Sequence, residues 1–513
     1  MEFNADPSSR LSAIGNGASR TTVLERRCDN QRLPIHQLPP ELLYDIIEDA
    51  YTQVSYKHLF ALRSVCKHWM EIIESMPQLW AQIALNHNAN LLSTILQKSA
   101  TQPLEVSCKE EDVGSDNAFE ERVAIFLQQI GPSAERWRSL HYSAPAVAQH
   151  ERILGLPLYN LETLTVKIST DAINYTGSFE APRLRNLDVN RLSLNWGSFS
   201  DLRSLQIDSC MPSPTVDELY ALLKSSPNLE LFKIARDRAS ATGRATDLSA
   251  VHSTPILLSK LQSIIVAQVP FLSHCRLLDL VEAPNLHRFT LYHHFHYHSY
   301  DFTPMFESAG RIVGAPTHSR GDDGGSRLAV VGANDLLAVI VGERRVILKN
   351  YEWSQGTRAA ERPAGLSAIL GRFDCTLREN IRVVRMSGLQ GVQEITDLAR
   401  VLNRHLPNVE DLELRVNPWS RTLGEISILA QLPSPPTGGR EAWLFPELVH
   451  FKIDAPKGLV CDGVLEVLKA RRDAGQVQVI RQLTIEGGTI RGDTVDELRS
   501  QCRELNMIDT EVA

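Results

Sequence analysis

Residues 182–189 read PRLRNLDV and residues 202–207 read LRSLQI, and both contain apolar side chains at positions one, four and six of a six-residue unit. The last four positions alternate, so the apolar side chains share one face of a β-strand and the intervening residues face away. Pro182 cannot continue a helix, so it separates the strand from whatever precedes it. The stretch therefore predicts a short, half-buried strand after a turn.

The same unit recurs along most of the chain. Successive units are 18 to 39 residues apart, except for one interval of 95 residues. Amphipathic helices are predicted between them: a capping box opens one at Thr215 and Glu218, the same signature recurs at Thr494 and Glu497, and residues 392–405 form a third. Strand–helix units stack side by side into a solenoid with a parallel sheet. The middle residues of the ten units are Leu164, Leu187, Leu205, Phe232, Ile264, Phe289, Val384, Leu412, Phe451 and Leu483.

This unit resembles the strand segment LxxLxL of the leucine-rich repeat, over roughly residues 137–490. The resemblance implies an α/β fold, with an irregular leucine-rich-repeat-like solenoid over residues 137–513. Residues 310–327 are rich in glycine and charge and predict a loop-rich insertion, while Val346–Leu348 indicates a further strand in the long interval. Residues 1–33 predict a disordered tail, and residues 86–136 a helical linker.

Residues 34–85 form a separate block of apolar, helix-forming sequence. Pro39 and Pro40 suit a helix entrance, and residues 59–73 place one continuous apolar face on a second helix. About fifty residues with this much apolar surface barely form a core of their own. Part of that surface should be covered by the next domain or by a partner.

The block resembles an F-box, so the resemblance implies three helices. The family motif has Leu-Pro, then Glu-Leu-Leu and an Ile pair, then Leu-Arg-x-Val-Cys-Lys-x-Trp, then Pro-x-Leu-Trp. The matching stretches here are Leu38-Pro39, Glu41-Leu42-Leu43, Ile46-Ile47, residues 62–69 and residues 77–80. An F-box followed by divergent leucine-rich repeats is similar to many fungal F-box proteins.

The resemblance implies a substrate-recognition adaptor of a Skp-cullin-F-box ubiquitin ligase. The F-box would dock to the Skp-family linker and, through it, to a cullin, while the repeats would hold a protein substrate for ubiquitination. A ligase-independent scaffold is the alternative. For each implied linker-contact residue, a purely structural role in the core is also open. The linker-contact residues are Leu38, Pro39, Leu42, Leu43, Ile46, Leu59, Leu62, Val65, Cys66 and Trp69.

On the solenoid, residues that alternate with the apolar set line the exposed sheet face. Their mixed charge indicates a protein ligand rather than a polyanion, although an ordinary solvated face is also open. The candidate substrate-binding residues are Asp188, Asp208, Lys233, Tyr292, Arg385, Glu413, Arg415 and Lys452.

Composition narrows the remaining function classes. The 513 residues have a net charge of -8, which disfavours nucleic-acid binding, and no apolar run is long enough for a membrane helix. No secretory signal is visible and the eight cysteines are scattered, so we expect an intracellular protein, cytoplasmic or nuclear.

Nucleotide-loop, zincin and hydrolase motifs are missing, so the sequence predicts neither enzyme activity nor a cofactor. His294, His296 and His298 would share a face if their strand continued, and His293 lies beside them. A polar strand end is the favoured interpretation of this histidine cluster, so no metal site is predicted.

Overall fold

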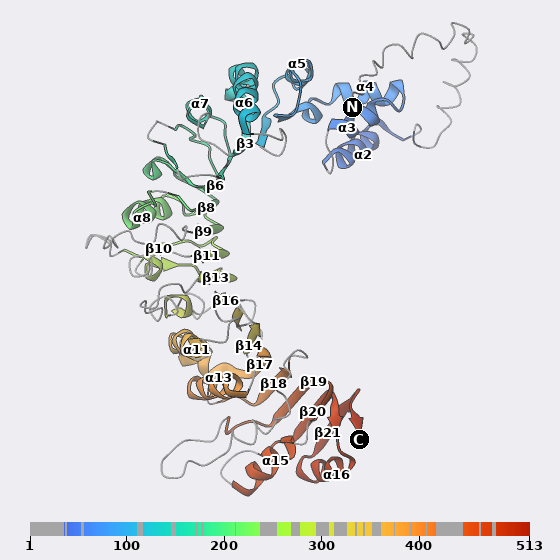
Figure 1. Cartoon of the computed structure of the whole chain (residues 1–513), viewed down its shortest axis with the longest axis vertical. Helices are drawn as coiled ribbons and strands as arrows, with labels where there is room; N and C mark the ends of the chain where they lie inside the picture. Colours follow the sequence, from blue (N-terminus) through green and yellow to red (C-terminus); the bar gives the residue numbers. More distant parts are fainter. Residues whose placement is uncertain are drawn as a thin grey trace, which may run out of the picture.

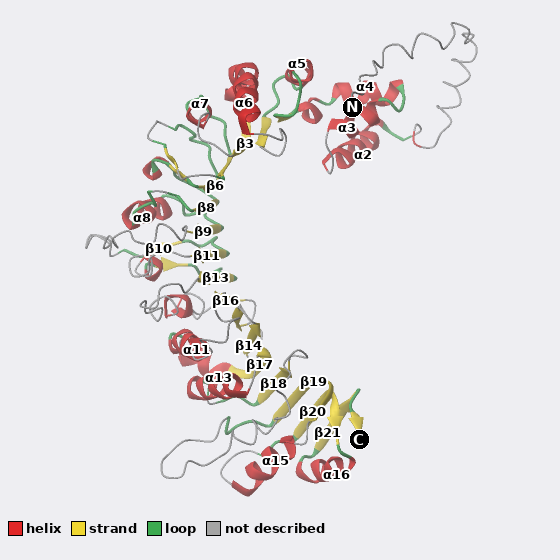
Figure 2. Cartoon of the chain, in the orientation of Figure 1, coloured by secondary structure: helices red, strands yellow, loops and turns green. Residues whose placement is uncertain are grey.

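In the computed structural model, a helical block leads into one long, curved α/β array (Figures 1 and 2). The strands line the inner side of an arc, and helices α7, α8, α11 and α13 lie on its outer side. The structure describes residues 35, 38–52, 56–109, 116–144, 150–169, 173–175, 179–210, 212–235, 254–267, 277–293, 307–311, 326–333, 336–341, 344–350, 361–373, 375–389, 392–406, 408–416, 445–460, 463–474 and 479–512.

The helical block contains α2, α3 and α4, followed by the 3-10 helix η3, and the solenoid adds further helices between its strands. The block has the bounds α2 Pro40–Thr52, α3 Tyr56–Arg63, α4 Lys67–Ser75 and η3 Pro77–Trp80. The later helices are α5 Ala89–Lys98, α6 Asp116–Ile130, η5 Gly131–Arg136, α7 His150–Leu154, η6 Trp196–Ser198, α8 Val216–Lys224, α11 Glu361–Gly371, α12 Cys375–Asn380, α13 Val392–His405, α15 Gly463–Ala474 and α16 Gly492–Gln501.

A single sheet runs through the array and, among the described residues, contains eighteen strands. Its strands are β1 Gln82–Ala84, β2 Leu104–Lys109, β3 Trp137–Ala144, β4 Thr163–Ile168, β6 Asn186–Asn190, β8 Ser204–Asp208, β9 Leu231–Ala235, β11 Ser263–Ala267, β13 Arg288–His293, β14 Ser326–Ala333, β15 Leu336–Val341, β16 Arg344–Asn350, β17 Ile381–Leu389, β18 Asp411–Val416, β19 His450–Val460, β20 Gln482–Ile490, β21 Glu504–Ile508 and β22 Glu511–Val512. Two small parallel pairs lie apart from it: β5 Ile173–Asn174 with β7 Leu192–Ser193, and β10 Ile256–Leu257 with β12 Val281–Glu282.

The repeat predicted from the sequence is the core of the solenoid. On each side of the long interval, successive middle residues pair in register, as Leu187 does with Leu205, and at the interval Phe289 pairs with Val346 of β16. All ten middle residues are at most 4% exposed. Because each strand buries one face against its own helix or loop layer, neighbouring units share one continuous apolar core. The fold is therefore the α/β, parallel-stranded solenoid that the sequence predicts, preceded by a helical block.

The sheet begins earlier than the sequence predicts. Strand β2 pairs in parallel with β1 on one side and with β3 on the other. Its alternating residues Leu104, Val106 and Cys108 are fully buried, so residues 86–136 contribute a repeat of the solenoid rather than a purely helical linker. Arg136 joins this first repeat to α5 by donating to Ser99 Oγ, 2.8 Å away, and to the carbonyl of Gln102.

The long interval in the repeat is filled by strands that break the parallel order. Strand β16 is parallel to β13, and β14 is parallel to β17. Strand β15 lies between β16 and β14 and is antiparallel to both of these. The strand predicted at Val346–Leu348 is thus confirmed as part of β16. The predicted insertion at 310–327 is only partly described: residues 310 and 311 are helical and residues 326 and 327 begin β14.

Candidate partner-binding surfaces

The helical block has a compact core made from one side of each helix. Leu43 and Ile47 of α2, Leu59 of α3 and Ile73 of α4 are fully buried. The Trp80 indole nitrogen donates to the carbonyl of Ile73 at 3.0 Å, which fixes η3 against α4. These contacts hold the three helices in one packing arrangement, so the outward side chains are presented on a rigid support.

A charged cluster ties the block to the first helix of the solenoid. The Arg63 Nε atom of α3 donates to Glu74 Oε1 of α4 at 3.1 Å, and the ammonium of Lys98 of α5 lies 3.4 Å from Glu74 Oε2. The hydrogen bond from Arg63 is the main reason that the pKa of Glu74 lies below its ordinary value.

Several large apolar side chains of the block remain in solvent. Leu42 is 47% exposed and Ile46 is 41% exposed, one turn apart on the same side of α2. Val65, in the turn between α3 and α4, is 55% exposed, and Ile35 and Phe60 are each 37% exposed. We refer to these five residues as the exposed apolar group. Their exposure within one small, packed block is typical of a surface that a partner covers.

The ten predicted linker-contact residues divide by burial. Leu43 and Leu59 are fully buried and Trp69 is 7% exposed. Because a partner cannot touch a side chain enclosed in the core, we expect these three to pack inside the block rather than to contact the linker. The other seven reach the surface in whole or in part: Pro39, Leu42, Ile46 and Val65 are exposed, and Leu38, Leu62 and Cys66 are half-buried.

Cys66 and Pro39 also shape the helix ends. The Cys66 thiol accepts a hydrogen bond from the Trp69 backbone at 3.5 Å and caps the start of α4. The carbonyl of Pro39 accepts from the backbone of Leu42 at 3.0 Å as α2 begins. Both residues therefore hold the turns that present the exposed apolar group.

A family model described as F-box-like matches residues 35–86 of this chain. We call this segment the F-box-like domain. No curated protein matches the chain. The structure of an internalin from Listeria monocytogenes str. 4b F2365 aligns over 78% of this chain and 90% of that chain, with 10% sequence identity and a TM-score of 0.24. A likeness this weak carries no argument, and the resemblance to fungal F-box proteins stays a prediction.

Beyond the F-box-like domain, the predicted substrate-binding residues lie on the inner, strand-lined side of the arc. Near the C-terminal end, Glu413 of β18 contacts the side chains of Arg385 on β17 and Lys452 on β19, with nitrogen–oxygen distances of 2.5 and 3.9 Å. Lys452 also pairs with Glu486 of β20 at 2.8 Å. That hydrogen bond is the main cause of a raised pKa for Lys452 and a lowered pKa for Glu486. We call these cross-strand pairs the ion-pair ladder.

The remaining predicted residues follow the same pairing scheme. Arg415 pairs with Asp454 at 3.0 Å, Asp188 with Lys167 at 3.6 Å and Lys233 with Asp208 at 3.4 Å. Tyr292 takes the register position opposite Ala267, and its side chain lies outside the described residues. All seven charged members of the predicted set thus have a partner on a neighbouring strand, and substrate binding by this face stays a prediction.

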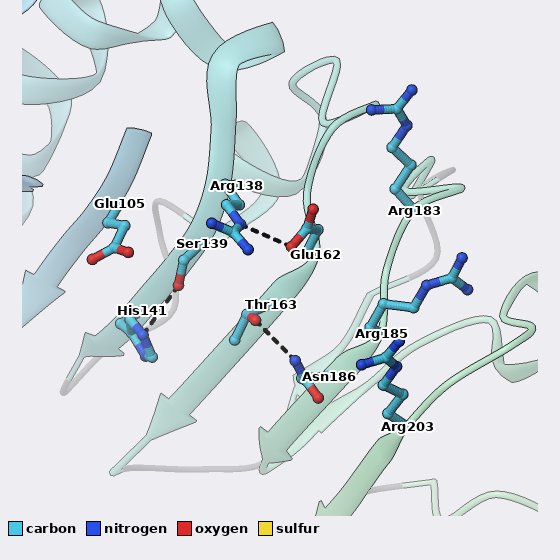
Figure 3. A pocket seen from close by; sticks show the side chains of 10 residues that line it. All are labelled: Glu105, Arg138, Ser139, His141, Glu162, Thr163, Arg183, Arg185, Asn186 and Arg203. Carbon is cyan, nitrogen blue, oxygen red and sulfur yellow. Dashed lines mark hydrogen bonds and ion pairs between the residues drawn. The ribbon is translucent and has the colours of Figure 1, made fainter. Parts of the chain in front are cut away.

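A polar hollow opens on the sheet where β2, β3, β4, β6 and β8 run side by side (Figure 3). Its volume is about 820 Å³. Five of its residues come from the strand faces, where Ser139 Oγ and His141 Nε2 lie 3.2 Å apart and Asn186 donates to Thr163 Oγ1 at 3.1 Å. Burial, and then the charge of Lys109, lower the pKa of His141, so its imidazole is neutral at pH 7. The five strand-face residues are Glu105, Ser139, His141, Thr163 and Asn186.

The other half of the lining carries most of the charge. Arg138 pairs with Glu162 at 2.8 Å, and Arg185, together with Arg183 and Arg203, completes the rim. Figure 3 shows Arg138, Arg185 and Arg203 near the starts of their strands and Arg183 on the loop that leads into β6. We call this site the arginine hollow, and our predictions from the sequence did not include its four arginines. The available signal was position: Arg138, Glu162, Arg185 and Arg203 each follow the opening apolar residue of a repeat unit.

A membrane-spanning helix and a metal site are both absent from the described residues. Within them, no helix has the length and apolar character needed to cross a bilayer, and no three His, Cys, Asp or Glu side chains are placed to hold a metal ion. Of the histidine cluster considered above, His294, His296 and His298 lie outside the described residues.

Proposed function

We propose that this protein is a substrate-recognition adaptor of a Skp-cullin-F-box ubiquitin ligase. In this proposal the F-box-like domain docks to the Skp-family linker, and the inner face of the solenoid holds a protein substrate. The chain contributes binding rather than catalysis, because tethering raises the effective concentration of substrate near the ubiquitin-charged enzyme.

The exposure of Leu42, Ile46 and Val65 on a rigid support is the observation that supports docking. Fully burying an aliphatic side chain of this size contributes about 1.5–3 kcal/mol, so half-exposed side chains contribute on the order of half that when a partner covers them. Three such residues on one small block supply apolar area for a partner to cover, and at an interface a few residues carry most of the binding energy. The mixed charges of the solenoid face support a protein substrate as the second partner.

The docking proposal is tested with the variant Leu42→Ala/Val65→Ala in the full chain, co-expressed with a Skp-family linker. We expect the amount of co-purified linker to fall by about tenfold or more, because two apolar contacts of roughly 1 kcal/mol each are lost. Both side chains are exposed, so the thermal unfolding midpoint should stay near that of the unchanged protein.

The matched control is Leu257→Ala/Val479→Ala, which removes two exposed apolar side chains outside the F-box-like domain, 58% and 44% exposed respectively. The control should co-purify as much linker as the unchanged chain. Equal loss in both variants, or no loss in either, would contradict docking through the exposed apolar group.

A further inference from the structure

We propose that the arginine hollow binds an acidic segment of a partner protein, whose carboxylates are held by Arg183 and Arg203. The inference rests on the proposed function, since it names the class of segment that the adaptor would hold. The binding itself is a property of the solenoid and is measured without the linker.

Backbone hydrogen bonds place four of the five charged rim residues in one row, and Arg183 lies two residues before Arg185 on the loop that leads into β6. The amide of Glu162 donates to the carbonyl of Arg138, that of Arg185 to Glu162, and that of Arg203 to Arg185, over distances of 2.6–2.8 Å. Neighbouring strands are about 4.8 Å apart, so the side chains of this row follow one another along the strand edge. An extended peptide lying across the strand ends would therefore pass several of these groups in succession.

The charges of the rim are only half neutralised. Arg138 is held by Glu162, and Arg185 is held by Asp201 at 2.6 Å. Among the described residues, the exposed side chains of Arg183 and Arg203 make no hydrogen bond or ion pair, although the charge of Arg203 contributes to the lowered pKa of Asp201. Two guanidinium groups thus remain available beside two that already bind carboxylates.

The chemistry of the site favours a carboxylate. The fork of an arginine matches the two oxygens of a carboxylate, and such charge-assisted pairs are the stronger hydrogen bonds in proteins. Two arginines of the hollow already bind carboxylates through one nitrogen–oxygen contact each, Arg138 with Glu162 and Arg185 with Asp201. A ligand that offers two or more carboxylates would extend an arrangement that the solenoid already makes.

The lining of the hollow argues against other ligands. All ten residues are polar or charged, whereas sites for organic cofactors are mostly apolar with a few polar groups. A volume of about 820 Å³ accommodates several side chains. Long nucleic acids are disfavoured, because affinity for a polyanion depends on neutralising many phosphates and the chain has a net charge of -8.

The test measures binding of fluorescent peptides to the purified full chain by anisotropy. One peptide contains alternating glutamates, and its partner has the same sequence with glutamines in their place. We expect the glutamate peptide to bind at least tenfold more tightly than the glutamine peptide. Arg183→Ala/Arg203→Ala should remove this preference, because it deletes the two arginines without internal partners.

The matched control is Arg481→Ala/Arg503→Ala. These exposed arginines occupy the same row at the other end of the sheet, where the Arg503 amide donates to the Arg481 carbonyl. The control should retain the glutamate preference. Three results would overturn the proposal: equal binding of both peptides, equal loss in both variants, or binding only of a phosphoserine peptide or an RNA oligonucleotide. Because no linker is present, failure here is distinct from failure of F-box docking.

Discussion

The two ends of the sheet share a backbone but use their surface charges differently. From β17 to β20, Glu413 and Lys452 belong to the ion-pair ladder, in which charges of opposite sign neutralise each other across strands. From β3 to β8, Arg183 and Arg203 make no side-chain hydrogen bond or ion pair among the described residues, although the charge of Arg203 acts on nearby Asp201. The core is equally buried at both ends. The difference teaches that the apolar repeat determines the fold, while the charges at solvent-facing positions are free to differ from one repeat to the next.

The largest expected effect should be the same at both ends. Leu187 and Leu483 are the buried middle residues of β6 and β20, 1% and 0% exposed. We expect Leu187→Ala and Leu483→Ala each to lower the free energy of unfolding by about 2–5 kcal/mol, because each leaves a cavity in the shared core. Urea unfolding followed by circular dichroism measures this effect. Gln206→Ala, on the solvent-facing side of β8, should change this free energy by less than about 0.5 kcal/mol, and a small effect at Leu187 would break the comparison.

A smaller effect should separate the two ends. Glu413→Gln removes the carboxylate between Arg385 and Lys452, and we expect a loss of about 0.5–1 kcal/mol in the free energy of unfolding, since these pairs are partly exposed. Arg183→Ala/Arg203→Ala should leave this free energy within about 0.5 kcal/mol of its original value, because no internal pair is lost. The same urea titrations measure both variants. If the arginine variant were the less stable one, these arginines would have a structural role instead.

The smallest expected effect is on the stability of the fold at acidic pH. Hydrogen bonds, from Asn228 to Asp201 and from Lys452 to Glu486, are the main causes of lowered pKa values for these carboxyl groups, with the charge of Arg185 also lowering that of Asp201. A lowered folded-state pKa contributes stability above the unfolded values of about 3.8 and 4.5, and this stability is lost as the pH falls through the folded-state pKa.

We therefore expect unfolding midpoints to be flat near neutral pH and to fall below about pH 4.5. Asp201→Asn and Glu486→Gln should each make that fall shallower, which urea midpoints between pH 7 and pH 3 would show. If the fall of the urea midpoint with pH were unchanged in one variant, its hydrogen-bonded pair would be weak in solution. The two ends of the sheet would then differ more in how their carboxyl groups contribute to stability.

The regular parts of the fold could be predicted because they depend on local patterns. The apolar period identified the strands, and Thr215 forms the predicted capping box at the start of α8, with its hydroxyl accepting from the Glu218 backbone. The capping box predicted from the same signature at Thr494 was wrong. Helix α16 begins at Gly492, with Arg491 as its N-cap, so Thr494 lies inside the helix and is buried. A motif of four residues does not determine the turn that precedes it.

Long-range arrangements could not be predicted in this way. The motif made Leu42 and Leu43 equivalent candidates for linker contact, yet the packing of α2 against its neighbours exposes the first and buries the second. The rim of the arginine hollow combines Arg138, Glu162, Arg185 and Arg203, which come from successive repeats 24, 23 and 18 positions apart, and only the stacking of strands brings them together.

Strand β15 has a consequence for how the solenoid can change in length. Because β15 runs against its neighbours, β16 and β14 keep the polarity of the flanking strands β13 and β17. Adding or deleting a single antiparallel strand between β13 and β17 would reverse the direction of every strand that follows. Strands can therefore be gained or lost here only in pairs. The connections between β14 and β15 and between β15 and β16 are two residues each, so these three strands follow one another without the long crossover that a parallel pair needs.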